Sequence, residues 1–130
     1  MKTPQLVFIT GASSGLGQAM ALRFYQAGYR LALVARRTAE VEKWAGANNI
    51  SAERYAVYSA DVADTSSIVA AGAACIASQG LPDVVIANAG ISVGIDTADF
   101  DDLEVLRATF ETNNIGMAAT FHPLVDAIRP

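Results

Sequence analysis

The chain has 130 residues and a mass of 13.6 kDa, which is a common size for a single domain. Hydrophobic residues make up 52% of it and charged residues 17%, so it is too apolar to be intrinsically disordered. The net charge of −4 and the pI near 4.7 argue against a nucleic-acid-binding protein, because phosphate contacts need clustered Lys and Arg. A mean hydropathy of +0.31 is high for a small protein and suggests that part of its surface packs against something else.

The sequence lacks the marks of a disulfide-bonded, metal-binding or membrane-spanning protein. Its one cysteine, Cys75, cannot form an internal disulfide, and its one histidine, His122, leaves no cluster with zinc-ligand spacing. The carboxylates of residues 96–104 lack the spacing of a calcium-binding loop, so we expect a solvated loop there. No apolar run approaches the roughly 18 residues that a membrane span needs. We therefore expect a cytoplasmic protein with no metal, and with neither nucleic acid nor membrane as a partner.

Short apolar runs alternate with helical patterns in the first half of the chain. Residues 6–9 and 31–35 are continuous apolar runs, which is typical of strands buried on both faces of a sheet. Between them, residues 15–28 have apolar positions at helical spacing and end on a helix-terminating glycine. A more polar helix is predicted over residues 38–47, and the alternating pattern of residues 54–58 predicts a third strand.

The second half continues this alternation and ends in a long helix. Residues 64–67 are typical of an N-cap region and predict a helix that continues through residue 77, and residues 84–87 predict a fourth buried strand. Residues 101–128 predict a long helical segment, either continuous or broken near Asn113. Strands that alternate with helices of this length predict an α/β fold with a doubly wound parallel sheet, in one domain over residues 1–130.

A glycine-rich loop joins the first strand to the first helix. Such a turn points backbone N–H groups and the positive end of the helix dipole at the carboxyl edge of the sheet, where a pyrophosphate fits. Gly11 would allow a tight turn, Gly15 a close approach of backbone to phosphate, and Gly17 close packing of helix on sheet. The hydroxyls of Ser13 and Ser14 would add donors. The loop therefore predicts a dinucleotide site, and an ordinary glycine-rich turn is the alternative.

The spacing of this loop resembles that of one enzyme family. Residues 10–17, with Leu16 between the last two glycines, resemble the T-G-x-x-x-G-x-G loop of the classical branch of the short-chain dehydrogenase/reductase family. The resemblance covers the whole chain but only the first half of a family member. It implies a Rossmann-type fold, with Asp61 holding the adenine amino group. Three further motifs follow at the family's intervals, namely Asp61-Val62, Asn88-Ala89-Gly90 and Asn113-Asn114-Ile115-Gly116.

The residues that follow the second strand indicate which nucleotide binds. In a doubly wound fold an acidic residue there binds the adenosine ribose, whereas arginine accommodates a 2′-phosphate. The sequence has Arg36 and Arg37, with no acidic residue before Glu40. Guanidinium groups form charge-assisted, bidentate hydrogen bonds with phosphate. We therefore predict NADP(H) over NAD(H), with Arg36 as the main contact and Arg37 or Ser13 assisting, and two solvated arginines are the alternative.

Most of the residues that would carry out the chemistry are missing from these 130 residues. The resemblance implies a Tyr-x-x-x-Lys pair, a preceding serine and a helix asparagine as the catalytic set. None of the four tyrosines is followed four residues later by a lysine. Only the asparagine can be carried over, to Asn113, where it would bind an ordered water, or to Asn114 if the register differs by one. A polar residue at a helix kink is the alternative interpretation.

The leading hypothesis is an NADP(H)-dependent oxidoreductase acting on a carbonyl or alcohol, present here as its dinucleotide-binding half and inactive alone. A non-catalytic NADP(H)-binding or regulatory module is the alternative, and a fragment that only assembles with itself is a third. Ser92, Val93 and Ile95 would line a substrate pocket. The implied strand order leaves residues 84–87 as an unpaired edge. The resemblance also implies a homodimer or tetramer.

Overall fold

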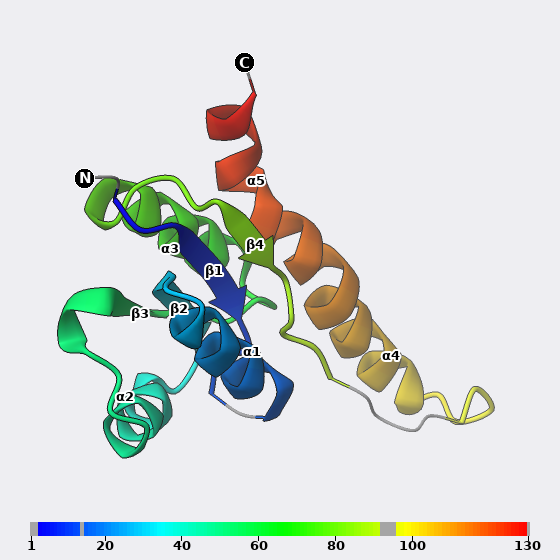
Figure 1. Ribbon diagram of the computed structural model, residues 1–130. Coiled ribbons are helices and arrows are strands. Elements are labelled where there is room, and N and C mark those ends of the chain that lie inside the picture. The colour runs from blue at the N-terminus through cyan, green and yellow to red at the C-terminus, as the bar shows by residue number, and fades with distance from the viewer. Residues whose placement is uncertain (1–2, 14, 92–95, 130) are drawn as a thin grey trace.

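Strands and helices alternate along the chain as the sequence predicts (Figure 1). The structure is a computed structural model and describes residues 3–13, 15–91 and 96–129, apart from the side chains of residues 126 and 128. The elements in chain order are β1 (Leu6–Thr10), α1 (Gly15–Gln26), β2 (Arg30–Ala35), α2 (Thr38–Ala47), a 3-10 turn (Ala52–Arg54), β3 (Tyr55–Ser59), α3 (Thr65–Ser78), β4 (Val84–Ile86), α4 (Asp102–Phe110), a π-helical turn (Glu111–Ile115) and α5 (Gly116–Ile128).

The four strands of the described residues form one parallel sheet in the order β3-β2-β1-β4. All five residues of β1 are buried, as are residues 31–35 of β2. Continuous apolar sequence suits these strands because helices cover both of their faces. Among the described strands β4 pairs only with β1, so the predicted open edge at residues 84–87 is confirmed.

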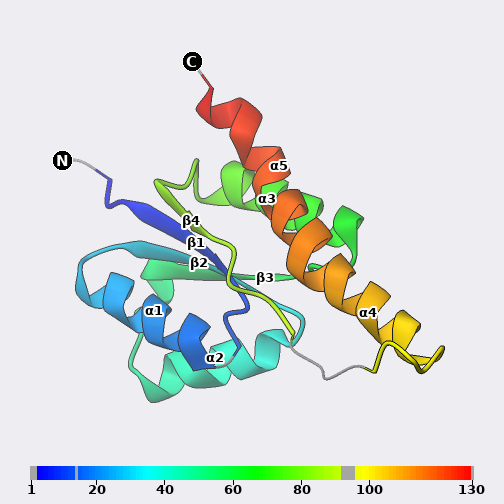
Figure 2. The ribbon, with the colours of Figure 1, turned by 90° about the vertical axis from the view of Figure 1, so that its right-hand side faces the viewer.

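Helices cover both faces of the sheet and give the molecule three layers (Figures 1 and 2). On one face, Ile9 of β1 belongs to the same core as Val41 of α2. On the other face, Phe8 shares a core with Ile68 of α3 and Leu124 of α5. Neighbouring residues of β1 enter opposite cores because side chains alternate along a strand. The arrangement is the Rossmann-like, doubly wound α/β fold that the sequence predicts.

Helices α3 and α5 pack closely because a glycine on one faces a proline on the other. A Cβ added to Gly72 of α3 would lie 2.5 Å from the Cγ of Pro123 in α5. Cys75, three residues further along α3, is fully buried in the same layer. Burial raises the pKa of the Cys75 thiol to about 11, so this residue is an unreactive part of the core.

The long helical segment is neither regular throughout nor broken. Its centre is a π-helical turn, Glu111–Ile115, in which the N–H of Gly116 donates to the carbonyl of Glu111 five residues earlier. A π turn accommodates one extra residue without ending the helix, and such turns are frequent at functional sites. The irregularity that the sequence suggests near Asn113 is therefore a local widening of a continuous helix.

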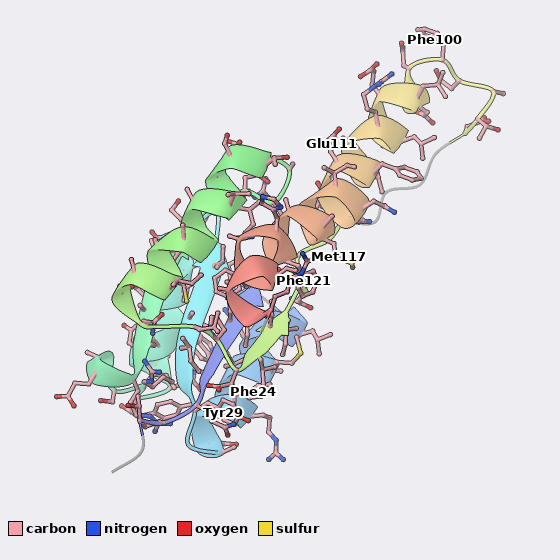
Figure 3. All side chains as sticks on the ribbon, turned by 90° about the horizontal axis from the view of Figure 1, so that it is seen from above. Phe24, Tyr29, Phe100, Glu111, Met117 and Phe121 are labelled. Carbon is pink, nitrogen blue, oxygen red and sulfur yellow. The ribbon has the colours of Figure 1, made fainter. Side chains whose placement is uncertain are left out.

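Large apolar side chains are exposed along α4 and α5. They recur at intervals of seven and four residues, which are spacings that favour one side of a helix. Figure 3 shows two of them, Met117 and Phe121, on the same side of α5. This surface accounts for part of the high mean hydropathy. The exposed residues are Leu103, Phe110, Met117, Phe121 and Val125.

We expect the substitution Gly72→Ala to destabilise the fold by about 1–3 kcal/mol, because the added methyl group overlaps Pro123. The matched control is Gly46→Ala in α2, where a Cβ would meet nothing within 4 Å. That control should stabilise the protein by up to about 1 kcal/mol through helix propensity alone. Urea unfolding followed by circular dichroism measures both changes. A Gly72→Ala variant as stable as the control would contradict the close packing of α3 on α5.

Candidate functional site

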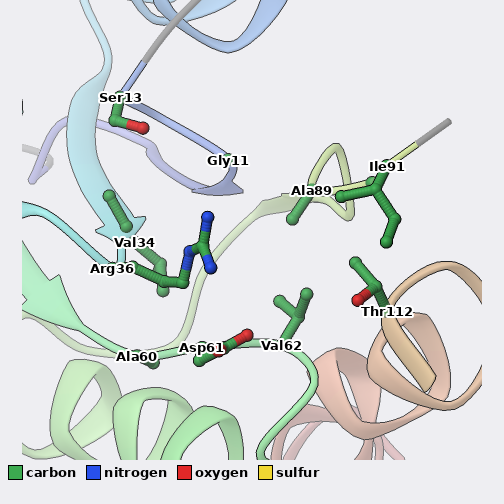
Figure 4. Close-up of a pocket in the computed structure, with 12 residues that line it drawn as sticks. Gly11, Ser13, Val34, Arg36, Ala60, Asp61, Val62, Ala89, Ile91 and Thr112 are labelled. Atoms are coloured by element: carbon green, nitrogen blue, oxygen red, sulfur yellow. The ribbon is translucent and has the colours of Figure 1, made fainter. Parts of the chain in front are cut away.

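A pocket of about 190 Å³ lies at the carboxyl ends of the strands (Figure 4). In an open parallel sheet the loops and helix N-termini converge at this edge, where ligands bind. The walls come from the loops after β1, β2, β3 and β4 and from the π turn of the long helix. The lining residues are Gly11, Ser13, Val34, Ala35, Arg36, Ala60, Asp61, Val62, Ala89, Gly90, Ile91 and Thr112.

The hydroxyl of Thr10 ties the loop after β1 to the loop after β4. Thr10 is the last residue of β1 and is buried. Its Oγ1 accepts hydrogen bonds from the backbone N–H of Asn88, at 3.0 Å, and of Ala89, at 3.1 Å. The side-chain amide of Asn88 in turn donates to the carbonyl of Gly11, at 3.3 Å. These bonds hold the Asn88-Ala89-Gly90 segment beside the glycine loop.

Two glycines of the loop have a left-handed backbone, with φ of +66° at Gly11 and +49° at Gly15. A Cβ added to Gly11 would lie 2.9 Å from both the Cα of Ala89 and the Nδ2 of Asn88, so the turn has no room for a side chain. A Cβ on Gly17 would overlap the carbonyl of Gly11. A Cβ on Gly15 would meet nothing within 4 Å, which leaves open space beside the first turn of α1.

The serines and the leucine of the loop differ in their relation to the pocket. Ser13 lines it, and its carbonyl accepts a hydrogen bond from Nε2 of Gln18, at 2.8 Å, which fixes the loop onto α1. Leu16 is 66% exposed and is not among the lining residues. Ser14 lies outside the described residues.

Arg36 extends from the end of β2 into the pocket. Its guanidinium points toward the middle of the pocket in Figure 4, whereas Arg37 is not among the lining residues. Within the part of the chain that the structure describes, neither guanidinium has an ion-pair or hydrogen-bond partner. A guanidinium carries five N–H donors, so Arg36 has its full donor set available for an anion.

Asp61 and Val62 form the side of the pocket that follows β3. Ser67, in the first turn of α3, fixes this loop: its Oγ donates to the carbonyl of Asp61, at 2.9 Å, and accepts from the N–H of Asp61, at 3.0 Å. The Oδ1 of Asp61 accepts from the N–H of Ala63, at 2.9 Å. These hydrogen bonds fix the conformation of the loop, and the Asp61 carboxylate is half-buried at the pocket wall.

Asn113 of the π turn fastens the long helix to the loop after β4. Its Oδ1 accepts from the backbone N–H of Ile91, at 2.8 Å, and its Nδ2 donates to the carbonyl of Ile91, at 2.7 Å. A Cβ on Gly90 would lie 3.1 Å from the Asn113 Oδ1, so glycine permits this approach. Asn114, the other candidate, is exposed and has no side-chain hydrogen bond among the described residues. The asparagine that contacts the site loop is therefore Asn113.

Sequence reasoning missed three contributors to this site. Thr112 lines the pocket directly before Asn113, but no sequence pattern marks the π turn that places it there. The Ser67 contact with Asp61 depends on the loop path after β3. The threonine of the T-G motif was visible in the sequence, but its role as acceptor for Asn88 and Ala89 depends on the pairing of β1 with β4. The predicted substrate-pocket residues 92, 93 and 95 lie outside the described residues.

The acidic residues between positions 96 and 104 form turns. Asp96 and Asp99 each accept a hydrogen bond from the backbone N–H two residues ahead, at 2.9 and 3.0 Å. Over the described residues, no group of three His, Cys, Asp or Glu side chains could hold a metal ion. No helix within residues 3–13, 15–91 or 96–129 has the length and apolarity required to cross a membrane.

Comparison with known families explains this combination of loops. The family described as short chain dehydrogenase matches residues 5–129. The chain belongs to this family. Two curated relatives are similar over most of the chain. A Drosophila melanogaster dehydrogenase/reductase SDR family protein 7-like is 40% identical over 72% of the chain, and the Mus musculus dehydrogenase/reductase SDR family member 7B is 34% identical over 95%. The chain spans only 30% and 39% of the lengths of these two relatives.

Solved short-chain dehydrogenase structures share the fold described above. An alcohol dehydrogenase from Thermococcus sibiricus, solved with 5-hydroxy-NADP, superposes with a TM-score of 0.86 at 28% identity, covering 97% of this chain and 54% of that one. A 3-ketoacyl-(acyl-carrier-protein) reductase from Brucella melitensis, solved with NADH, has a TM-score of 0.82 at 28% identity, covering 94% of this chain and 49% of that one. The present chain therefore corresponds to about half of either protein.

We expect Thr10→Val, which keeps the shape of the side chain but removes the hydroxyl, to destabilise the protein by about 1–3 kcal/mol for each N–H left without an acceptor. The Ala89 N–H is the donor that loses its acceptor, because the Asn88 N–H also donates to the carbonyl of Ile86, at 3.1 Å. Thr10→Ser retains the acceptor and should stay within about 1 kcal/mol of the wild type, since it removes one buried methyl group. Thermal unfolding of the three proteins provides the comparison. Equal stability of Thr10→Val and Thr10→Ser would show that the hydroxyl does not hold the loops.

Proposed function

We propose that this chain is the dinucleotide-binding half of an NADP(H)-dependent oxidoreductase that acts on a carbonyl or alcohol substrate. Membership of the short-chain dehydrogenase family supports the reaction class. The nicotinamide ring of such a cofactor supplies the hydride that a carbonyl carbon accepts, or takes up the hydride that an alcohol carbon releases. The part of the reaction that these residues serve is the binding and orientation of the nucleotide.

The shape of the glycine loop fits a pyrophosphate. Gly11 makes the turn, and the space beside Gly15 is open at the start of α1, where backbone N–H groups and the helix dipole favour an anion. Ser13 supplies a hydroxyl at the same wall. In this assignment the adenosine contacts the Asp61-Val62 segment, and the nicotinamide ribose contacts the Asn88-Ala89-Gly90 segment. Leu16 and Gly17 belong to the phosphate loop.

The single observation that favours NADP(H) is the unpaired Arg36 guanidinium inside the pocket. The end of β2 is where a doubly wound fold meets the 2′ position of the adenosine ribose. A 2′-phosphate there would pair with Arg36 by charge-assisted hydrogen bonds, with Ser13 as a second donor. Solved relatives contain either NADH or an NADP derivative, so the choice of nucleotide depends on residues such as Arg36 rather than on the fold.

A second candidate is a non-catalytic module that binds NADP(H). The observation in its favour is that these 130 residues contain no lysine four positions after a tyrosine, so the proton-donating pair that the resemblance implies is missing. Both candidates share the same nucleotide site and differ only in turnover. A cytoplasmic location and a homodimeric or tetrameric assembly remain predictions from the sequence.

We expect the wild-type chain to bind NADP⁺ at least about tenfold more tightly than NAD⁺, because a charged hydrogen-bonded phosphate contributes about 1.5–3 kcal/mol. Arg36→Ala should raise the Kd for NADP⁺ by about tenfold or more and leave the Kd for NAD⁺ nearly unchanged. Isothermal titration calorimetry with both nucleotides measures this difference.

Arg37→Ala is the matched control, because it removes an equal charge from the neighbouring position outside the pocket lining. We expect it to raise the Kd for NADP⁺ by less than about threefold, the effect of a screened surface charge. A wild type that prefers NAD⁺, or equal losses in the two variants, would contradict the role of Arg36.

The 130-residue chain is also expected to bind NADPH without oxidising it, because it lacks the Tyr-x-x-x-Lys pair that the resemblance implies as proton donor. The measurement is the decay of NADPH absorbance with a panel of ketones and aldehydes, compared with buffer and with an active short-chain dehydrogenase. Substrate-dependent NADPH oxidation by a protein of confirmed 13.6 kDa mass would disprove the inactivity of this chain.

A further inference from the structure

We propose that the hydroxyl of Thr112 hydrogen-bonds the edge of the adenine base of the bound nucleotide. This inference rests on the proposed function, since it assigns a further contact within the same pocket. Thr112 belongs to the π turn, Glu111–Ile115, is half-buried and lines the pocket. It is the one lining residue contributed by the long helix.

The hydroxyl of Thr112 differs from those of two other threonines in the same helical segment. Thr109 and Thr120 each donate to the backbone carbonyl four residues earlier, Val105 and Gly116, both at 2.8 Å. This is the usual partner of a threonine hydroxyl inside a helix. Thr112 makes no such bond, and its hydroxyl has no partner among the residues that the structure describes. Its hydrogen-bonding capacity is therefore available to a ligand.

The start of α5 explains why Thr112 reaches the Asp61-Val62 side of the pocket. A Cβ on Gly116 would lie 2.5 Å from the carbonyl oxygen of Val62 and 2.9 Å from its Cβ. Glycine at this position thus lets the helix press against the loop after β3. Thr112 precedes Gly116 by four residues, close to one helical turn, so its side chain is carried to the same loop. Figure 4 shows Thr112 beside Val62, at the opposite end of the pocket from Ser13.

The chemistry of this end of the pocket suits a base better than a phosphate. Ser13 at the other end and Arg36 in the middle of the pocket supply the donors for phosphate, while Asp61 is a carboxylate that would repel an anion. Adenine presents an amino donor next to ring-nitrogen acceptors. A carboxylate can only accept, whereas a hydroxyl can donate and accept, so Thr112 complements Asp61 by offering a donor to a ring nitrogen.

The test is calorimetric titration of adenosine 2′,5′-bisphosphate, and of 5′-AMP in parallel, into the wild type and three variants. Thr112→Val keeps the shape and removes the hydroxyl, and we expect it to raise the Kd of both ligands by about three- to tenfold. Thr112→Ser keeps the hydroxyl and should bind within about twofold of the wild type. Thr109→Val removes a hydroxyl from the same helical segment outside the pocket lining and should leave both Kd values unchanged.

The outcomes separate this inference from the proposed function. Thr112→Val binding as tightly as wild type, or Thr112→Ser binding as weakly as Thr112→Val, would overturn the hydroxyl contact while nucleotide binding stands. Binding of 5′-AMP without any gain from the 2′-phosphate would overturn the NADP(H) preference and still measure the Thr112 contact. A wild type of native circular dichroism that binds neither ligand would overturn both proposals.

Discussion

The arrangement of the site depends on one buried hydroxyl. Thr10 ends the central strand β1, and its Oγ1 accepts from two consecutive backbone N–H groups after β4. Both groups lie just after an edge strand; the Asn88 N–H also donates to the carbonyl of Ile86, whereas the Ala89 N–H has Thr10 as its one acceptor among the described residues, and an N–H left without a partner is unfavourable. The same contact brings Asn88 within reach of the Gly11 carbonyl. The glycine loop and the loop after β4 are thus positioned by the sheet itself, and the pocket between them is preformed.

The π turn connects this preformed pocket to the rest of the long helix. It widens the helix where two neighbouring side chains must reach different targets: Thr112 the pocket and Asn113 the backbone of Ile91. A carboxamide can make four hydrogen bonds, and Asn113 uses two of them on Ile91. Its first role is therefore to position the loop after β4. One donor and one acceptor of the Asn113 carboxamide are left, and these are the groups with which it would bind an ordered water.

The sequence predicts most of the fold because its signals are local. Buried parallel strands require apolar runs, and the glycine loop requires particular residues at particular backbone angles, so residues 6–9 and 31–35 and the loop between residues 10 and 17 are recognisable from the chain alone. The π turn is not recognisable, because residues 111–115 have no composition that distinguishes it from an α-helical turn. Local sequence also does not show where the Arg36 guanidinium lies, since its position depends on which loops surround the end of β2. Sequence thus locates the nucleotide-binding motifs, and only the packed structure shows which of their side chains enter the pocket.

The four tyrosines of this chain lie away from the pocket at the carboxyl ends of the strands. None of them lines the pocket, and each has a structural contact elsewhere. The hydroxyl of Tyr25 accepts from the N–H of Ser51, and the ring of Tyr29 packs edge-on against Phe24. The hydrogen bond to Glu42 raises the pKa of Tyr55, and burial raises that of Tyr58. A tyrosine that donates a proton near neutral pH needs a lowered pKa and a place beside the reacting carbonyl. None of the four lines the pocket, and the pKa values of Tyr55 and Tyr58 are raised rather than lowered, so an acid for hydride chemistry would have to come from residues other than the tyrosines of this chain.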